Sequence, residues 1–159
     1  MKKLNLSHLL VIIIGSLSAI IIIMLITINI GKQDDVIYFV SKTNSENSTF
    51  WHSVERGVKV AADELGIELI FVGPEREVDL NDQIQLVLEG INMKPSAIIL
   101  AASDYNALSD ISKQVMDNNI TFLTVDSDVN IAEEHSFIAT NNIKAAKQLG
   151  EVMANYMGG

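Results

Sequence analysis

After residue 33, short apolar runs alternate along the chain with longer segments in which apolar residues recur every three or four positions. The runs are nearly continuous and rich in aliphatic and aromatic residues, a pattern typical of strands that helices cover on both faces. They span residues 36–40, 67–72, 97–102, 121–125 and 136–139. Each run therefore predicts one strand.

The segments between and after the runs predict four amphipathic helices, because their apolar residues return at helical spacing. Gly66 can stop the first helix, and Ser103 or Asp104 can cap the third. The expected inner faces are Phe50, Val54, Gly57, Val58, Ala61, Ala62 and Leu65; Leu80, Ile84, Val87, Leu88 and Ile91; Ala107, Leu108, Ile111, Val115 and Met116; and Ala145, Ala146, Leu149, Val152, Met153 and Tyr156. Strands that alternate with helices predict an α/β fold, a Rossmann-like parallel sheet flanked by helices.

The first 33 residues contain no acid and one uncharged apolar run of 22 residues, 9–30. As a helix this run would rise about 33 Å, enough to cross a hydrocarbon core of about 30 Å. Lys2 and Lys3 precede it, so the positive-inside rule places the following domain outside the cytoplasm. The run is long for a signal peptide, so we expect an uncleaved single-pass membrane anchor; an unusual cleaved signal is the alternative.

Composition excludes several classes of function. Residues 34–159 carry all 20 acids and eight of the 11 bases, a formal charge of −12, which argues against a nucleic-acid partner. The chain has no Cys, no Gly-rich nucleotide loop and no nucleophile elbow. His8, His52 and His135 lie far apart and are expected to be lone surface side chains. We therefore expect neither an enzyme nor a bound cofactor or metal.

Ligands of open parallel sheets gather at the carboxyl ends of the strands, which here are the loops that start at Ser41, Gly73, Ala101, Asp126 and Thr140. Phe50 and Trp51 stand at the first strand-to-helix junction, where two adjacent aromatics cannot easily both face the core. We expect one of them to line a cleft; alternatively, Phe50 fastens its helix to the core.

Two further loops carry polar candidates. The Asp126 carboxylate directly follows a strand and can accept two hydroxyl hydrogen bonds, each worth about 1.5–3 kcal/mol. Its alternative role is to cap a turn with Ser127 and Asp128. In the segment 140–142 an N-cap by Asn141 or Asn142 is the alternative to ligand binding.

Four segments carry a resemblance to a known family: FWHSVERGVKVAADELGIELIFVGP, NDQIQLVLEGINMKPSAIILAASDYNAL, ITFLTVDSDV and FIATNN. Their order and spacing resemble the type 1 periplasmic binding proteins of the ribose and galactose kind, the sugar-binding components of bacterial ABC importers. The resemblance covers residue 36 to the end. It implies that Phe50 and Trp51 stack on a sugar ring, that Asp126 binds sugar hydroxyls, and that Asn142 matches an Asn at the crossover between two lobes.

The chain also departs from that family. Asn141 stands where the family has Asp, Ser127-Asp128 where the ribose binders place an Arg, and Ala101 where a polar Asn is common. Family members have two lobes and nearly twice the length of this domain. With the cytoplasmic tip and the anchor or signal already expected in residues 1–33, the resemblance implies an amino-terminal sugar-binding lobe in 34–141 and the first helix of a missing second lobe in 142–159.

These observations together predict an extracytoplasmic solute-binding protein that binds a monosaccharide or a related small polar ligand for an ABC importer. The expected partners are the sugar and a membrane permease. The alternative is a membrane-anchored sugar-sensing module that serves a chemoreceptor or a sensor kinase. The predicted ligand-binding residues are Phe50, Trp51, Asp126, Ser127 and Asn142.

Overall fold

The computed structural model describes residues 15–18, 20, 24 and 35–158. Contacts divide the chain into two units, Met1–Asp35 and Val36–Gly159, and the second holds the predicted lobe. Most of the run 9–30, and with it the predicted anchor, lies outside the described residues. No helix within the described part of the chain has both the length and the apolar character needed to cross a bilayer.

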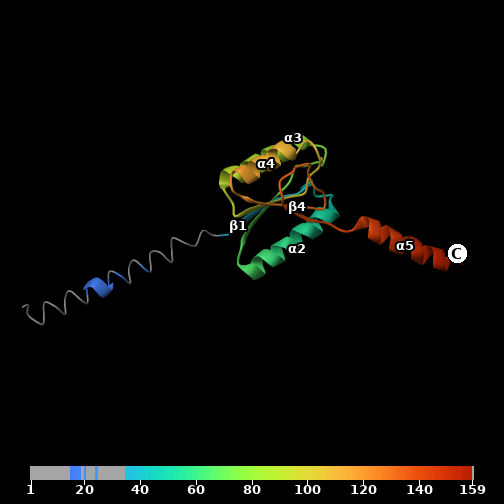
Figure 1. The fold of residues 1–159 in the computed structure, drawn as a ribbon, viewed down its shortest axis with the longest axis horizontal. Helices are drawn as coiled ribbons and strands as arrows, with labels where there is room; N and C mark the ends of the chain where they lie inside the picture. The colour runs from blue at the N-terminus through green and yellow to red at the C-terminus, as the bar shows by residue number, and fades with distance from the viewer. Residues whose placement is uncertain (1–14, 19, 21–23, 25–34, 159) are drawn as a thin grey trace, which may run out of the picture. The chain divides into compact units, whose positions relative to one another are not determined.

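The second unit is a parallel α/β domain, as the sequence predicts (Figure 1). Its strands are β1 (Val36–Val40), β2 (Glu68–Val72), β3 (Ala97–Leu100), β4 (Thr121–Val125) and β5 (Ser136–Ile138). Its helices are α2 (Thr49–Leu65), α3 (Leu80–Met93), α4 (Ser109–Asp117) and α5 (Asn142–Tyr156). The predicted strands are confirmed to within two residues at each end.

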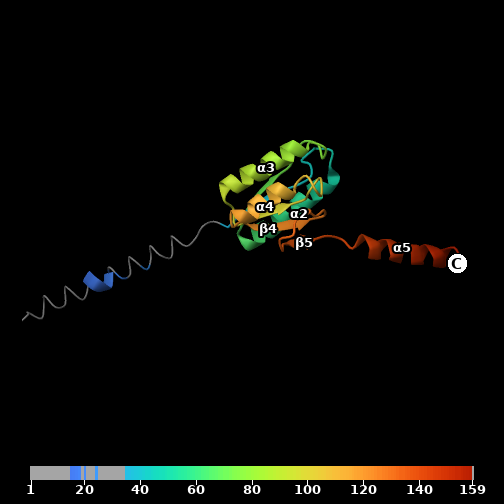
Figure 2. The same cartoon turned by 45° about the horizontal axis from the view of Figure 1, so that its top comes forward.

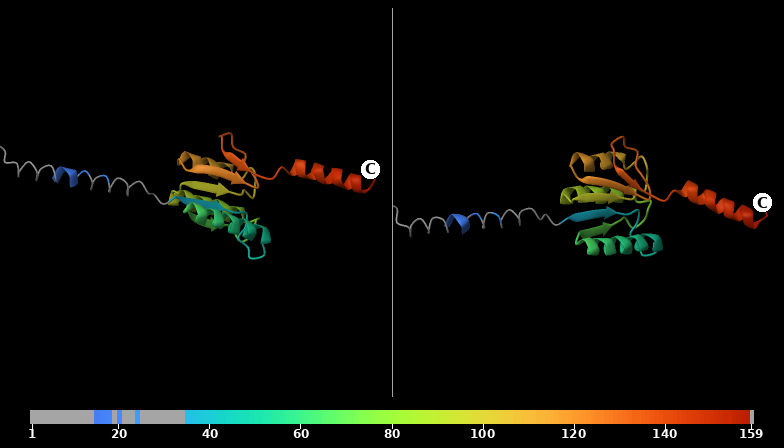
Figure 3. Two further views of the ribbon diagram at one scale, coloured as in Figure 1. Left: turned by 90° about the horizontal axis from the view of Figure 1, so that it is seen from below. Right: turned by 60° about the horizontal axis from the view of Figure 1, so that its bottom comes forward.

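The five strands form one sheet in the order β2-β1-β3-β4-β5, and every neighbouring pair is parallel (Figure 3). The order reverses at β1, which pairs with β2 on one side and with β3 on the other. In such sheets the loops on either side of the reversal diverge and leave room for a ligand at the carboxyl ends of the strands. The topology thus predicts a ligand site at the loops that follow β1 and β3.

Helices cover both faces of the sheet, with α2 on one face and α3 and α4 on the other (Figure 1). Strand β1 contributes side chains to the core on both faces of the sheet, because successive side chains of a strand point to opposite faces. Tyr38 and Val40 pack in the larger cluster beneath α3 and α4, whereas Phe39 packs with Trp51 on the α2 face. This arrangement explains why the strands are apolar without strict alternation.

The third predicted helix begins later than expected. Ala107 was assigned to its inner face, but α4 starts at Ser109. The Asp104 carboxylate accepts hydrogen bonds from the backbone N–H groups of Asn106 and Ala107, each at 2.8 Å, which is the capping role predicted for it, but the residues that it caps form a separate turn before α4. These two N–H donors also lower the pKa of Asp104.

Helix α5 projects away from the other elements and has no buried residue (Figure 2). Its apolar stripe is exposed, with Leu149 at 61% and Tyr156 at 93%. Asn141 is its N-cap and accepts a hydrogen bond from the Lys144 N–H at 2.9 Å. The capping role considered for the segment 140–142 is therefore filled by Asn141.

Candidate functional site

The residues that follow the strands form what we call the carboxyl edge of the sheet. It comprises Ser41, Lys42, Gly73, Ala101, Ser103, Asp104, Asp126 and Ser127. Gly73 is required there by close packing, since a Cβ at this position would lie 2.3 Å from the Ser41 Oγ and 3.0 Å from the Asn44 backbone nitrogen. The loops after β1 and β2 consequently approach each other at backbone distance.

Asp126 lies at the carboxyl edge and is held by an ion pair that the sequence did not reveal. Its Oδ2 is 3.0 Å from the Nζ of Lys42, whose side chain is only 15% exposed. Ser127 donates a hydrogen bond from its Oγ to the same Oδ2 at 3.3 Å, and Glu77 approaches the Lys42 Nζ at 3.6 Å. The Asp126 side chain remains 41% exposed, so it can still accept hydrogen bonds from a ligand.

The backbone of Asp126 is in the left-handed region, with φ of 65°. Few residues other than Gly adopt this conformation, and Asp is among those that tolerate it best. The Asp126 N–H donates to the Ile138 carbonyl at 3.0 Å, which ties the turn to the end of β5. Asp126 therefore combines the turn role and the exposed-acid role that the sequence left as alternatives.

Phe50 and Trp51 have opposite environments. Phe50 is 56% exposed, whereas Trp51 is 5% exposed and packs with Phe39 and Ala101. Their rings meet edge to face with centroids 5.0 Å apart. The possibility that Phe50 fastens α2 to the core is wrong, because Trp51 fills that place. Phe50 is the member of the pair with a free ring surface.

A hollow of about 440 Å³ lies between the loops that follow β2 and β3. Its lining includes the acids Glu77 and Asp104 and the side chain of Ser103. The Ser103 Oγ is buried and has no hydrogen-bond partner among the described residues.

The remaining predicted site residue is Asn142. It is the first residue of α5 and is exposed. The structure thus brings Asp126 and Ser127 together at the carboxyl edge, whereas Asn142 lies beyond β5 at the base of the projecting helix. Lys42 and Glu77 join the site without having been predicted; the signal in the sequence was a Lys two residues after the first apolar run.

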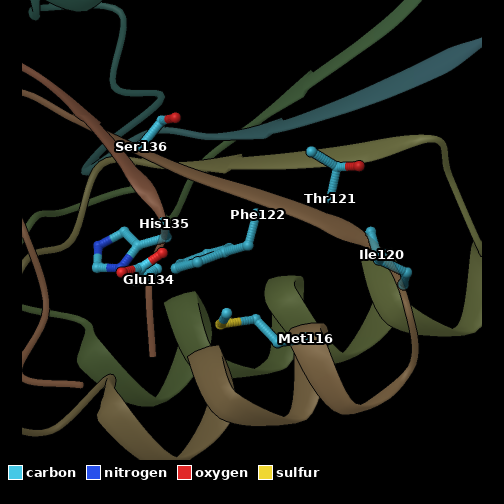
Figure 4. A pocket seen from close by; sticks show the side chains of 7 residues that line it. All are labelled: Met116, Ile120, Thr121, Phe122, Glu134, His135 and Ser136. Atoms are coloured by element: carbon cyan, nitrogen blue, oxygen red, sulfur yellow. The ribbon is translucent and has the colours of Figure 1, made fainter. Parts of the chain in front are cut away.

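The expectation of lone surface histidines is wrong for His135. Its side chain is 9% exposed, and its Nε2 lies 2.7 Å from the Asp128 Oδ1. Figure 4 shows its ring beside Phe122, where the ring centroids are 5.6 Å apart. His52, by contrast, is 41% exposed and lies 3.6 Å from Glu55, and His8 lies outside the described residues.

The His135 pair shifts the ionisation of both partners. Burial alone would lower the pKa of His135, but the hydrogen bond to Asp128 and the contact with the Glu133 carbonyl outweigh it and raise the pKa. Burial alone would raise the pKa of Asp128, but hydrogen bonds from His135, Thr124 and the Val129 N–H lower it. The pair joins the two ends of the loop between β4 and β5, and the Thr124 hydroxyl, which donates to Asp128 at 2.8 Å, ties this loop to β4.

A hollow of about 540 Å³ next to His135 is lined by Met116, Phe122 and Glu134, among others (Figure 4). It also includes Thr121 and Ser136, the first residues of β4 and β5. It therefore opens at the amino ends of these strands and not at the carboxyl edge. Within the described residues, no group of three or more His, Asp or Glu side chains is placed to hold a metal ion.

Several solved structures of sugar transporters and solute-binding proteins are similar to this domain. A sugar transporter from Clostridium phytofermentans is 34% identical with a TM-score of 0.68, over 76% of this chain and 44% of that chain. A solute-binding protein from Agrobacterium vitis with bound D-fucose is 32% identical with a TM-score of 0.67, over 77% and 43%. The periplasmic component of a sugar transport system from Hahella chejuensis is 30% identical with a TM-score of 0.65, over 70% and 40%.

The chain thus spans less than half the length of each of these structures. The comparison with protein families gives a match to the periplasmic binding protein domain over residues 37–159, which is most of the chain. The parallel sheet, its reversal at β1 and the polar carboxyl edge agree with that match. The chain belongs to the periplasmic binding protein family.

Proposed function

We propose that this chain supplies one side of the binding site of an extracytoplasmic solute-binding protein for a neutral monosaccharide. The observation that carries the proposal is the carboxyl edge, where an exposed Asp126 carboxylate is oriented by Lys42. Family membership and the sugar-binding titles of the similar structures support it. In this proposal Phe50 provides the stacking surface, and Trp51 supports Phe50 from below.

The charges at the carboxyl edge favour an uncharged ligand. Lys42 is within 4 Å of two carboxylates, those of Glu77 and Asp126, so its charge is already compensated. Asp104 adds another carboxylate to the neighbouring hollow. A sugar acid or a sugar phosphate would meet this excess of negative charge, whereas the hydroxyls of a neutral sugar can donate to the carboxylates.

The proposal has a direct test on the 159-residue chain. We expect weak binding, in the millimolar range and thus about −4 kcal/mol, because the chain spans less than half of the similar structures and holds only part of the contacts. NMR titration with a panel of neutral monosaccharides that includes D-fucose measures such affinities. Asp126→Asn keeps the tolerance for positive φ and should weaken binding by about 1 kcal/mol or more.

Phe50→Ala should weaken binding similarly, because it removes the exposed ring. Asp117→Asn is the matched control: it removes an exposed acid at the end of α4, at the opposite edge of the sheet, and should leave binding unchanged. The proposal is overturned if no monosaccharide in the panel binds, or if Asp117→Asn and Asp126→Asn have equal effects.

We also propose that residues 9–30 anchor the domain on the outer side of a bacterial membrane, where it serves an ABC permease. Mass analysis of membrane-extracted protein should then find Met1 retained; a new amino terminus near Ala19 or Gly31 would contradict the anchor. The exposed stripe of α5 supports the proposal that this helix belongs to a second lobe. A retained anchor would equally suit a sensor partner, and purification with crosslinking to a permease or a kinase distinguishes the two.

A further inference from the structure

A buried glutamine lies directly beneath the carboxyl edge. Gln83 is in the first turn of α3, and its side chain is fully buried. Its Nε2 donates hydrogen bonds to the carbonyls of Ser41 and Ala101, both at 2.9 Å. Its Oε1 accepts a hydrogen bond from the Ser103 N–H at 3.0 Å. The orientation of the amide group follows from its partners, since carbonyls require a donor and an N–H requires an acceptor.

The three partners of Gln83 belong to the two loops between which the strand order reverses. Ser41 follows β1, whereas Ala101 and Ser103 follow β3. The Ser41 carbonyl is part of the peptide unit that leads into Lys42, the residue that orients Asp126. The Ser103 N–H precedes Asp104, which lines the neighbouring hollow. The Gln83 side chain thus fixes the backbone of both loops, the one that carries Lys42 and the one that carries Asp104.

Independent contacts immobilise the same backbone from the other side. The Ser41 N–H donates to the Val72 carbonyl at 2.8 Å, and the Ser41 Oγ lies 3.1 Å from that carbonyl. The Ala101 N–H donates to the Val40 carbonyl at 2.9 Å. The N–H groups of Ser41 and Ala101 thus bond to neighbouring strands, and Gln83 donates the hydrogen bonds that their carbonyls accept.

We propose that Gln83 is a positioning residue of the binding site: it does not touch the ligand but sets the geometry of Lys42 and of the Ser103–Asp104 segment. This inference rests on the proposed function for its effect on sugar binding, and on the hydrogen bonds alone for its effect on the backbone. An apolar residue of similar size would fill the same volume but leave three buried backbone groups unpaired. Gln83 therefore acts through its hydrogen bonds as well as through the volume that it fills.

Two substitutions separate these contributions. Gln83→Met is close in volume and removes all three hydrogen bonds, whereas Gln83→Glu keeps an acceptor for the Ser103 N–H but loses the NH2 group that donates to both carbonyls. By amide hydrogen exchange on the 159-residue chain, we expect the Ser103 N–H to exchange at least tenfold faster in Gln83→Met than in Gln83→Glu. Equal exchange rates of this amide in the two variants would overturn the inference.

Sugar binding is the second readout, with D-fucose as the probe in an NMR titration. Both Gln83 variants should weaken binding at least fivefold. Val87→Ala is the matched control, because Val87 is fully buried one turn further along α3 and its apolar side chain makes no hydrogen bond to the edge. Denaturant is added to the wild type and to Val87→Ala until their free energies of unfolding equal those of the Gln83 variants, so that binding is compared at equal stability. If Val87→Ala loses as much sugar affinity as the Gln83 variants, Gln83 acts only by stabilising the fold, and the positioning role is overturned.

The two proposals fail in different ways. If the unaltered chain binds no monosaccharide, the proposed function fails, and the exchange comparison still decides whether Gln83 sets the backbone. If a variant does not fold, exchange in the unaltered chain decides instead. The Ser103 N–H should then exchange as slowly as the amides of the β3 strand, and fast local exchange would overturn the inference.

Discussion

Two helical glycines provide a test of how this domain packs, because one is buried and the other is open. Gly90 on α3 is buried, and a Cβ there would lie 2.7 Å from Cδ1 of Tyr38 and 3.2 Å from Cδ1 of Ile98. Gly57 on α2 is exposed and has nothing within 4 Å of the same position. Substitution by Ala therefore raises the helix propensity equally at both sites, but it adds a close contact only at Gly90.

The magnitudes decide the sign of each effect. Replacing Gly by Ala in a helix interior stabilises by about 1 kcal/mol. At Gly90 this gain is opposed by overpacking, which costs about 1–3 kcal/mol when neighbours cannot move. Tyr38 is 2% exposed and Ile98 is fully buried, so neither ring nor methyl group can turn toward solvent. We expect Gly57→Ala to stabilise by about 0.5–1 kcal/mol and Gly90→Ala to destabilise by about 1–2 kcal/mol.

Urea unfolding gives the free energy of both variants. Trp51 is the only Trp of the chain and is 5% exposed, so its fluorescence reports the loss of the core. Far-ultraviolet circular dichroism should give the same midpoints, because a small domain unfolds cooperatively. If Gly90→Ala is as stable as Gly57→Ala, the close contact between α3 and β1 is not rigid, and the argument from packing fails.

The other predictions concern the aromatic pair, the histidine pair and the edge glycine. Trp51→Ala should lower the free energy of unfolding by about 3–5 kcal/mol, and Phe50→Ala by no more than about 1.5, as followed by circular dichroism. Because folding raises the pKa of His135, the stabilisation from His135 should be complete below pH 6.5, its ordinary pKa, and should disappear as the pH rises through its pKa in the folded protein. Because folding lowers the pKa of Asp128, the stabilisation from Asp128 should be present above pH 3.8 and lost as the pH falls through its pKa in the folded protein. His135→Gln should therefore reduce the loss of stability between pH 5.5 and 8.5 in urea titrations, and an unchanged pH profile would contradict the pairing. Gly73→Ala should destabilise by about 1–3 kcal/mol, since its Cβ would lie 2.3 Å from a buried hydroxyl.

The fold could be predicted from the sequence because its elements follow from local patterns. Five short apolar runs and the helical stripes between them predict a parallel sheet covered on both faces, and the structure confirms it. The start of α4 could not be predicted from periodicity alone. There Asp104 caps a turn over residues 105–108 that α4 does not include, and a break between a capped turn and the next helix leaves no periodic signal.

The site was predicted less completely than the fold. Asp126 is a candidate because it directly follows a strand, and the sequence also indicates that only one of Phe50 and Trp51 can face the core. Which of the two is buried depends on the angle at which α2 meets the sheet, a tertiary property. Lys42 was missed because its pairing with Asp126 joins loops that are 84 positions apart in the chain.

Gln83 shows most clearly why a buried polar group escapes pattern analysis. It lies three residues after Leu80 and four before Val87, so it occupies the inner face of α3 among apolar neighbours. On that face a polar residue looks like an interruption of the stripe. Burial without partners would cost several kcal/mol, however, so its presence there implies hydrogen bonds to backbone groups that the helix itself cannot supply. In a parallel sheet the nearest such groups are the peptide units just past the strand ends, where a helix begins and a ligand binds. A polar residue in the first turn of an otherwise apolar helix face therefore indicates a residue that organises the binding edge from beneath.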